Sequence, residues 1–166
     1  MLTSGEVRSA MTLSEMFHVG IVVPDIDAAR ARLAGLLGLE WGPIVETALE
    51  VRGADGHDAV VPNRMCYSTA PPYIELVQEQ PGTPWVCNPH SNLHHIGFFS
   101  DAVAADSKGL TRARCPLELA GRTGDASPTR FTYHRDDLGV RVELVDSAMR
   151  QVMEEWLCKA DPGAAR

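Results

Sequence analysis

Two stretches of the chain share one pattern of apolar and polar positions. The first is FHVGIVVPDIDAARARLAGL, residues 17–36, and the second is HHIGFFSDAVAADSKGL, residues 94–110. In each stretch a short apolar run ends at a Pro-Asp or Ser-Asp break, and an Ala-rich segment of helical composition follows. The pattern therefore predicts a strand, a turn and a helix, twice.

A second pair of similar segments closes each half. YIELVQ, residues 73–78, resembles RVELVD, residues 141–146. In each half, shorter β-like runs lie between the first repeated segment and the second. The first half is about nine residues longer, and we place this insertion in the Gly- and Asp-rich stretch 52–63. The repeat predicts two modules with the same order of elements.

The remaining segments complete the expected domain organisation. Residues 1–14 form a poorly ordered leader. Residues 15–147 form a single domain that contains module 1, residues 15–80, and module 2, residues 92–147.

A helix is expected to follow the domain, over residues 147–160. Its apolar positions have the spacing of an amphipathic helix, whose apolar face packs on the core or forms a subunit interface. These positions are Met149, Val152, Met153, Trp156 and Leu157.

Composition and charge exclude several classes of protein. The 166 residues are 45% hydrophobic and carry a formal net charge of −7 without any basic run, which argues against nucleic acid as a partner. No apolar run approaches the roughly 20 residues of a membrane helix. The four cysteines are widely spaced and form no Cys-x-x-Cys pair, so we expect a cytoplasmic protein without disulfides or a zinc knuckle.

One histidine and one glutamate occupy matching strand positions in each half: His18 and Glu75 in the first, and His95 and Glu143 in the second. Each residue alone is compatible with a hydrogen-bonded or exposed strand position. If the two halves curl around one cavity, however, all four side chains meet there. Two buried carboxylates repel each other, and a divalent cation removes the conflict. Nitrogen and oxygen donors together suit Zn, Ni, Co, Fe or Mn.

These motifs resemble the vicinal oxygen chelate superfamily, which includes glyoxalase I, methylmalonyl-CoA epimerase, extradiol dioxygenases and bleomycin-resistance proteins. HVGIVVPD, IEL, HHIGF and GVRVELVD stand in the family's order, over about residues 16–147. The resemblance implies an α+β fold in which two pseudo-repeated βαβββ modules form a curled mixed sheet around a metal-binding cavity, with a C-terminal helix added here. It also implies one divalent metal ion per site, held by His18, Glu75, His95 and Glu143.

The activity that the resemblance implies is that of a metal-dependent isomerase, epimerase or lyase. Such an enzyme removes a proton next to a carbonyl and stabilises the resulting enolate or enediolate, as in a methylmalonyl-CoA epimerase or a glyoxalase. Glu143, with Glu75 as second choice, is the catalytic candidate, and the substrate is a small molecule such as an acyl-CoA or a thiol adduct. The alternatives are a drug-binding protein of the same fold without catalysis and an Fe(II) dioxygenase.

Four further residues are candidates for the substrate pocket: His134, Tyr133, Phe99 and Glu50. Glu46 and Glu50 are also candidates for a separate base. Strand alternation predicts that His94 points away from its neighbour His95 and is a bystander. The alternative for His94, and for His90, is that the side chain supports a ligand or forms part of the pocket wall. Modules of the resembling family often pair across subunits, so we also expect a homodimer.

Overall fold

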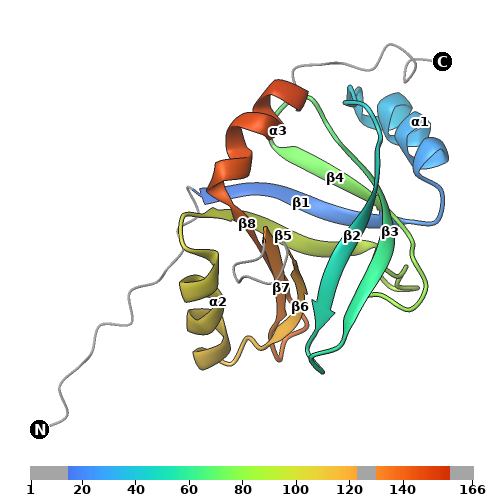
Figure 1. Ribbon diagram of the computed structural model, residues 1–166. Coiled ribbons are helices and arrows are strands. Elements are labelled where there is room, and N and C mark those ends of the chain that lie inside the picture. The colour runs from blue at the N-terminus through green and yellow to red at the C-terminus, as the bar shows by residue number, and fades with distance from the viewer. Residues whose placement is uncertain (1–14, 123–129, 158–166) are drawn as a thin grey trace, which may run out of the picture.

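The computed structural model describes residues 15–122 and 130–157 (Figure 1). The leader expected over residues 1–14 lies outside the described residues, as does the end of the predicted helix 147–160 beyond residue 157.

The described chain repeats one order of elements, strand, helix and three strands, and then ends in a short helix. This confirms the predicted α+β fold with two βαβββ halves. The elements are β1 (Met16–Val23), α1 (Ile26–Leu37), β2 (Val45–Gly53), β3 (Asp58–Tyr67), β4 (Tyr73–Gln78), β5 (Leu93–Ser100), α2 (Val103–Arg112), β6 (Leu117–Gly121), β7 (Phe131–Arg135), β8 (Arg141–Asp146), the 3-10 turn η2 (Ser147–Met149) and α3 (Arg150–Leu157).

The strands form one mixed sheet that closes into a barrel in the order β1-β4-β3-β2-β6-β7-β8-β5. The two halves meet first where β1 runs antiparallel to β5, and each of these strands is parallel to the last strand of its own half, β4 or β8. They meet again where β2 pairs with β6, from Val51 opposite Gly121 to Gly53 opposite Leu119. The predicted curl of the sheet is thus complete.

The helices lie on the outside of the barrel. Helix α1 begins after Asp25, whose carboxylate accepts a hydrogen bond from the backbone N–H of Ala28 at 3.0 Å. It ends at Gly38, whose φ of 66° is a left-handed conformation that glycine adopts without strain. Ile26 of α1 packs with Leu76 on the outer face of the first half, and α2 covers β6, β7 and β8 of the second.

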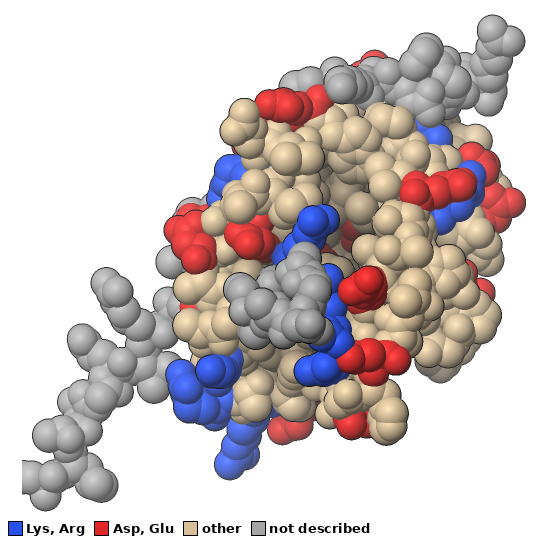
Figure 2. All heavy atoms as spheres, in the orientation of Figure 1, with Lys and Arg blue, Asp and Glu red and all other residues tan. Residues whose placement is uncertain are grey.

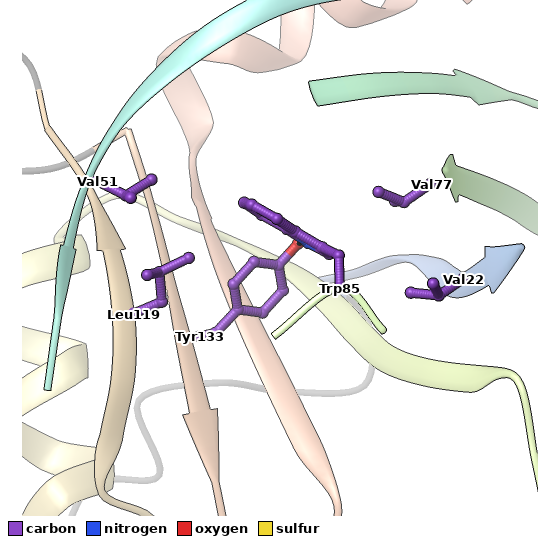
Figure 3. Close-up of a cluster of buried hydrophobic side chains, with 6 residues drawn as sticks. All are labelled: Val22, Val51, Val77, Trp85, Leu119 and Tyr133. Carbon is purple, nitrogen blue, oxygen red and sulfur yellow. Dashed lines mark hydrogen bonds between the residues drawn. The ribbon is translucent and has the colours of Figure 1, made fainter. Parts of the chain in front are cut away.

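A cluster of apolar side chains fills one end of the barrel (Figure 3). Trp85, from the loop that joins the halves, inserts between the strands, and its Nε1–H donates to the hydroxyl oxygen of Tyr133 at 3.4 Å. The joining loop therefore contributes to the core of the barrel. The buried members of the cluster are Val22, Val51, Val77, Trp85, Leu119 and Tyr133.

Helix α3 packs against a second apolar cluster. Met153 and Leu157 of this helix are buried with Tyr67, Phe99 and Val145. The amphipathic pattern of the tail thus reflects packing on the core, the first of its two interpretations.

Only part of the extra length of the first half lies in the hairpin of β2 and β3, which spans residues 45–67 against 117–135 for β6 and β7; the rest precedes β2. Strands β2 and β3 have 9 and 10 residues, whereas β6 and β7 have 5 each. Pairing continues to Arg52 opposite Asp58, whose side chains form an ion pair at 2.7 Å. The Gly- and Asp-rich composition belongs to the turn between the two strands, where Gly56 has a φ of 81°.

Acidic and basic side chains are both spread over the face of the molecule shown in Figure 2. Among the helices that the structure describes, none is long and apolar enough to cross a membrane.

A half-buried ion pair joins two strands of the second half. Nε and Nη2 of Arg141 in β8 donate to the carboxylate of Glu118 in β6 at 2.6 and 2.9 Å, and Nη1 donates to the carbonyl of His94 at 3.3 Å. Burial by itself raises the pKa of Glu118, but Arg141 outweighs burial and holds this pKa below its ordinary value of 4.5. The ionised carboxylate is therefore favoured by folding. The ionised carboxylate contributes to the free energy of unfolding above the pKa of the unfolded chain. This contribution is lost as pH falls through the lower pKa of the folded protein.

We predict that Glu118→Gln lowers the free energy of unfolding by about 1–2 kcal/mol at neutral pH, because the substitution removes a charged and largely buried hydrogen-bond pair. The difference from wild type should shrink as pH falls below about 4. Urea denaturation at both pH values measures it. The matched control is Glu46→Gln, whose carboxylate binds Arg64 but is 69% exposed, so its effect should stay below about 0.5 kcal/mol. An equal loss for Glu118→Gln at both pH values would contradict the prediction.

Candidate metal centre

The fold brings together the four ionisable residues that the repeat singles out. His18 lies on β1 and His95 on β5, the two strands along which the halves meet, and Glu75 and Glu143 lie on β4 and β8, which flank them. One ligand atom from each of the four side chains lies within 4.8 Å of the others, and all four side chains are buried. The sequence repeat thus becomes a pseudo-twofold arrangement around one point.

Two glycines make room for the histidine rings. A Cβ added to Gly20 would overlap the ring of His95, and one added to Gly97 would overlap the ring of His18. Each ring therefore lies directly over the glycine of the opposite half. This reciprocal packing explains the spacing His-x-Gly in both halves of the sequence.

The four donor atoms are spaced as ligands of one small ion require. The Nε2 atoms of His18 and His95 are 2.8 Å apart. Nε2 of His18 lies 3.0 Å from Oε2 of Glu143 and 3.6 Å from Oε2 of Glu75. Nε2 of His95 lies 3.0 Å from Oε2 of Glu75 and 3.3 Å from Oε2 of Glu143. Metal–ligand bonds of about 2.0–2.2 Å place neighbouring donors roughly 2.8–3.6 Å apart, from octahedral to tetrahedral angles, so the residues fit a divalent ion.

The same conclusion follows from the unpaired atoms of the cluster. Oε2 of Glu75 and Oε2 of Glu143 are buried and have no hydrogen-bond donor of suitable geometry within residues 15–122 and 130–157. Buried carboxylate oxygens are costly unless they are paired or coordinate a metal. The mixed oxygen and nitrogen donor set suits Zn, Ni, Co, Fe or Mn.

The charges of the cluster depend on one another. Burial lowers the pKa of His18, but the nearby carboxylates of Glu143 and Glu75 outweigh this effect and raise the pKa to about 9. The pKa of His95 is also raised, against burial, by the same two carboxylates. Burial raises the pKa of each carboxyl group, yet the histidines hold the pKa of Glu75 and of Glu143 below the ordinary value. Two carboxylates are thus balanced here by two protons or by one divalent cation.

A tyrosine stands opposite each glutamate on the neighbouring strand. Tyr67 on β3 stands opposite Glu75, and its hydroxyl donates to Oε1 of Glu75 at 2.6 Å. Tyr133 on β7 stands opposite Glu143 in the same way. Burial and then the negative charges of the glutamates raise the pKa of both phenols well above 10. Each phenol therefore remains a hydrogen-bond donor.

Tyr67 is the residue of the site that sequence reasoning missed. A signal for it was present, because Tyr67 follows Arg64 in RMCY as Tyr133 follows Arg130 in RFTY. The offset of the two tyrosines in the repeat is 133 − 67 = 66, close to the offset of 143 − 75 = 68 for the glutamates opposite them.

The four residues predicted for the substrate pocket do not lie together: two are near the cluster and two are not. Tyr133 lies inside the barrel, with its ring centroid 5.0 Å from that of His95. Phe99 reaches the cluster through Phe17. The ring centroid of Phe99 lies 4.5 Å from that of Phe17, and the ring centroid of Phe17 lies 5.0 Å from that of His18. The other two residues are on the outside of the barrel.

His134 and Glu50 are not brought to the cluster. His134 is buried on the face of β7 opposite Tyr133, and its Nδ1 donates to the carbonyl of Cys115 at 3.0 Å. Glu50 is exposed on β2, where the neighbouring Val51 takes the inward position. Glu46, the other candidate for a separate base, pairs with Arg64 on the surface.

His94, in contrast, belongs to the site, and our expectation that it points away from His95 is wrong. Pairing between β5 and β1 shifts register here: His95 stands opposite Gly20, and Leu93 opposite Ile21, which leaves His94 as the extra residue of a bulge. A bulge interrupts the alternation of side chains along a strand. The rings of His94 and His95 accordingly lie 5.1 Å apart and both pack against Tyr133. Burial, followed by the charge of Arg141, lowers the pKa of His94 to about 3, so its ring is neutral.

Comparison with known proteins agrees with this fold. A family model described as the Glyoxalase/Bleomycin resistance protein/Dioxygenase superfamily matches residues 17–133, which include His18, Glu75 and His95 but end before Glu143. No sequence match is found among curated proteins.

Several solved structures are similar to the chain in fold. A variant of the Streptomyces coelicolor methylmalonyl-CoA epimerase, in complex with 2-nitronate-propionyl-CoA, is 21% identical with a TM-score of 0.56, over 82% of this chain and 96% of that one. A methylmalonyl-CoA epimerase in complex with methylmalonyl-CoA and NH4+ is also 21% identical with a TM-score of 0.56, over 81% and 94%. The epimerase from Mycobacterium tuberculosis is 19% identical with a TM-score of 0.51, over 87% and 98%.

We predict that Gly20→Ala lowers the free energy of unfolding by about 1–3 kcal/mol, because the new methyl group displaces the ring of His95 from a tightly packed interior. Thermal and urea denaturation measure the change. The control is Gly35→Ala on α1, where a Cβ meets nothing within 4 Å; there the higher helix propensity of alanine should stabilise the protein slightly. If both substitutions had the same small effect, the proposed packing of His95 over Gly20 would be incorrect.

Proposed function

Because the chain belongs to the Glyoxalase/Bleomycin resistance protein/Dioxygenase superfamily, we propose that it is a divalent-metal-dependent isomerase that moves a proton on a carbon next to a carbonyl, as a methylmalonyl-CoA epimerase does. The observation that carries this proposal is the buried cluster of His18, Glu75, His95 and Glu143. It has the donor set of a metal centre and, in the same place, two carboxylates that can exchange a proton.

The four residues of the cluster would hold one ion per chain. Such an ion supplies a Lewis acid, which polarises a carbonyl oxygen and makes the proton on the adjacent carbon easier to remove. The apolar clusters on either side, around Trp85 and around Phe99, limit access of water to this centre. Exclusion of water strengthens each electrostatic interaction inside.

Glu143 is our choice for the residue that takes the proton, with Glu75 as second choice. Glu75 is fixed by the 2.6 Å hydrogen bond from Tyr67 and is 3% exposed, whereas Glu143 is 6% exposed. Both carboxylates are buried, so the choice rests on the hydrogen bond that holds Glu75 in place. Tyr133 stands opposite Glu143 on the neighbouring strand, and its ring packs against that of His95.

The substrate class that we propose is an acyl-CoA thioester. The solved complexes of similar fold hold methylmalonyl-CoA or 2-nitronate-propionyl-CoA, which supports a thioester over the thiol adduct of a glyoxalase-type lyase. A homodimer and a cytoplasmic location are part of the same proposal. Val152 of α3 is 57% exposed, and in this proposal a second subunit covers it.

We predict that the purified protein binds about one divalent ion per chain, and that His18→Ala abolishes binding while the fold is retained. The substitution removes one of four donors but leaves the two apolar clusters in place. Metal analysis after dialysis against Ni²⁺, Co²⁺, Zn²⁺ or Mn²⁺ measures the stoichiometry, and circular dichroism monitors the fold. His57→Ala, at an exposed turn, is the control and should bind as wild type does. A wild-type protein that takes up none of these ions would support a drug-binding protein of this fold instead.

We also predict that the metal-loaded protein exchanges the proton on the carbon next to the thioester of methylmalonyl-CoA with D₂O, and that Glu143→Gln slows exchange by about 10²-fold or more, because an amide cannot accept the proton. Proton NMR follows the exchange. Glu46→Gln, on the surface, should exchange at the wild-type rate. Equal rates for Glu143→Gln and wild type would exclude Glu143 as the base, and Glu75→Gln would then be tested in the same way.

A further inference from the structure

The two ligand histidines have different neighbours at one pseudo-equivalent position. In β1 the extra residue of a bulge is Phe17, just before His18, and in β5 it is His94, just before His95. The offsets agree, since 94 − 17 and 95 − 18 are both 77. Each bulge turns the ring of the preceding residue onto the ring of the histidine, at 5.0 Å in the first half and 5.1 Å in the second. One half thus has an apolar ring where the other has an imidazole.

His94 forms two hydrogen bonds that fix where protons lie. Its Nε2 is 2.8 Å from the carbonyl oxygen of Pro84, and its Nδ1 is 2.9 Å from Nδ1 of His95. A carbonyl oxygen only accepts, so Nε2 of His94 carries a proton. The ring is buried, and the guanidinium of Arg141 bonds the carbonyl of the same residue, so a second proton on the ring is unfavourable. Nδ1 of His94 is therefore the acceptor, and the shared proton belongs to His95.

This assignment determines which atom of His95 faces the carboxylates. A neutral imidazole has one N–H and one lone pair, and the hydrogen bond of one nitrogen sets the role of the other. With Nδ1 of His95 protonated, the lone pair is on Nε2, the atom that lies 3.0 Å from Glu75 and 3.3 Å from Glu143. A metal ligand needs its lone pair there.

His18 lacks this arrangement. Among the residues that the structure describes, no hydrogen-bond partner is found for Nδ1 of His18, and its bulge neighbour is Phe17. The two imidazoles of the cluster are thus held unequally, one by a hydrogen bond and one by packing alone.

We infer that His94 is a positioning residue of the metal centre, which holds His95 in the form with Nδ1 protonated and so makes His95 the stronger of the two imidazole ligands. This inference rests on the proposed function, since it assigns a role toward the bound ion. A chain of hydrogen bonds then runs from the carbonyl of Pro84, in the loop that joins the halves, through His94 to His95.

Space filling alone does not account for the residue at this position. The first half shows that a phenylalanine meets the packing requirement beside a ligand histidine. A polar ring that is 8% exposed and bonded at both nitrogens instead has a directional role. His94→Phe therefore separates packing from hydrogen bonding, since it places in the second half the residue that the first half already uses.

The test compares three variants by titration with Zn²⁺ and Co²⁺ against a chelator of known affinity. His94→Phe should weaken metal binding 10- to 100-fold, the usual effect of removing the hydrogen-bond partner of a ligand histidine. His94→Gln should recover most of the affinity, because its amide can accept from His95 and donate to Pro84. His90→Gln, at an exposed position of the same loop, should bind as wild type does. The absorption spectrum of bound Co²⁺ should change in His94→Phe and remain close to wild type in His94→Gln.

Nitrogen NMR of the imidazoles gives a readout that stability does not affect. In the Zn²⁺-loaded protein, His94 should be protonated at Nε2 and His95 at Nδ1. Protonation of His94 at Nδ1, or equal affinity of wild type and His94→Phe, would overturn the inference and leave the proposed function standing. Wild-type protein that takes up no ion would overturn the proposed function and the role of His94 with it.

Discussion

The whole interior is organised around the need to hold two carboxylates, Glu75 and Glu143, out of water at one point. Like charges in a medium of low dielectric constant repel strongly, so both must be balanced by protons or by a cation. The two histidines lie between the carboxylates and can balance their charge, and the hydroxyl of Tyr67 donates a hydrogen bond to Glu75. The glycines opposite the histidines allow the rings to approach so closely.

The duplicated fold supplies these groups in pairs, and one position breaks the pairing. Each half gives a histidine, a glutamate and a tyrosine from equivalent strands. At the bulge before the histidine, however, Phe17 of one half corresponds to His94 of the other. A symmetric scaffold thus holds a cluster whose two imidazoles have different neighbours.

Closure of the barrel isolates this centre. The loop between the halves inserts Trp85 into one end, and α3 packs Met153 and Leu157 against the apolar cluster that contains Tyr67 and Phe99. Pairing of β2 with β6 joins the two edges of the sheet. Both apolar clusters therefore include side chains from segments outside the repeated unit.

The sequence by itself determined the order of the elements, the two halves and the four residues of the cluster, because a repeat with the spacing of strands and helices limits the topology to few possibilities. It could not decide which neighbours share a face. Alternation within a single strand cannot show that His94 occupies a bulge, since the bulge exists only in the pairing of β5 with β1. In the same way the register between β7 and β8, with Tyr133 opposite Glu143, turned Tyr133 inward and His134 outward. Contacts between segments far apart in the chain set the register, and the register decides on which side of the sheet each side chain lies.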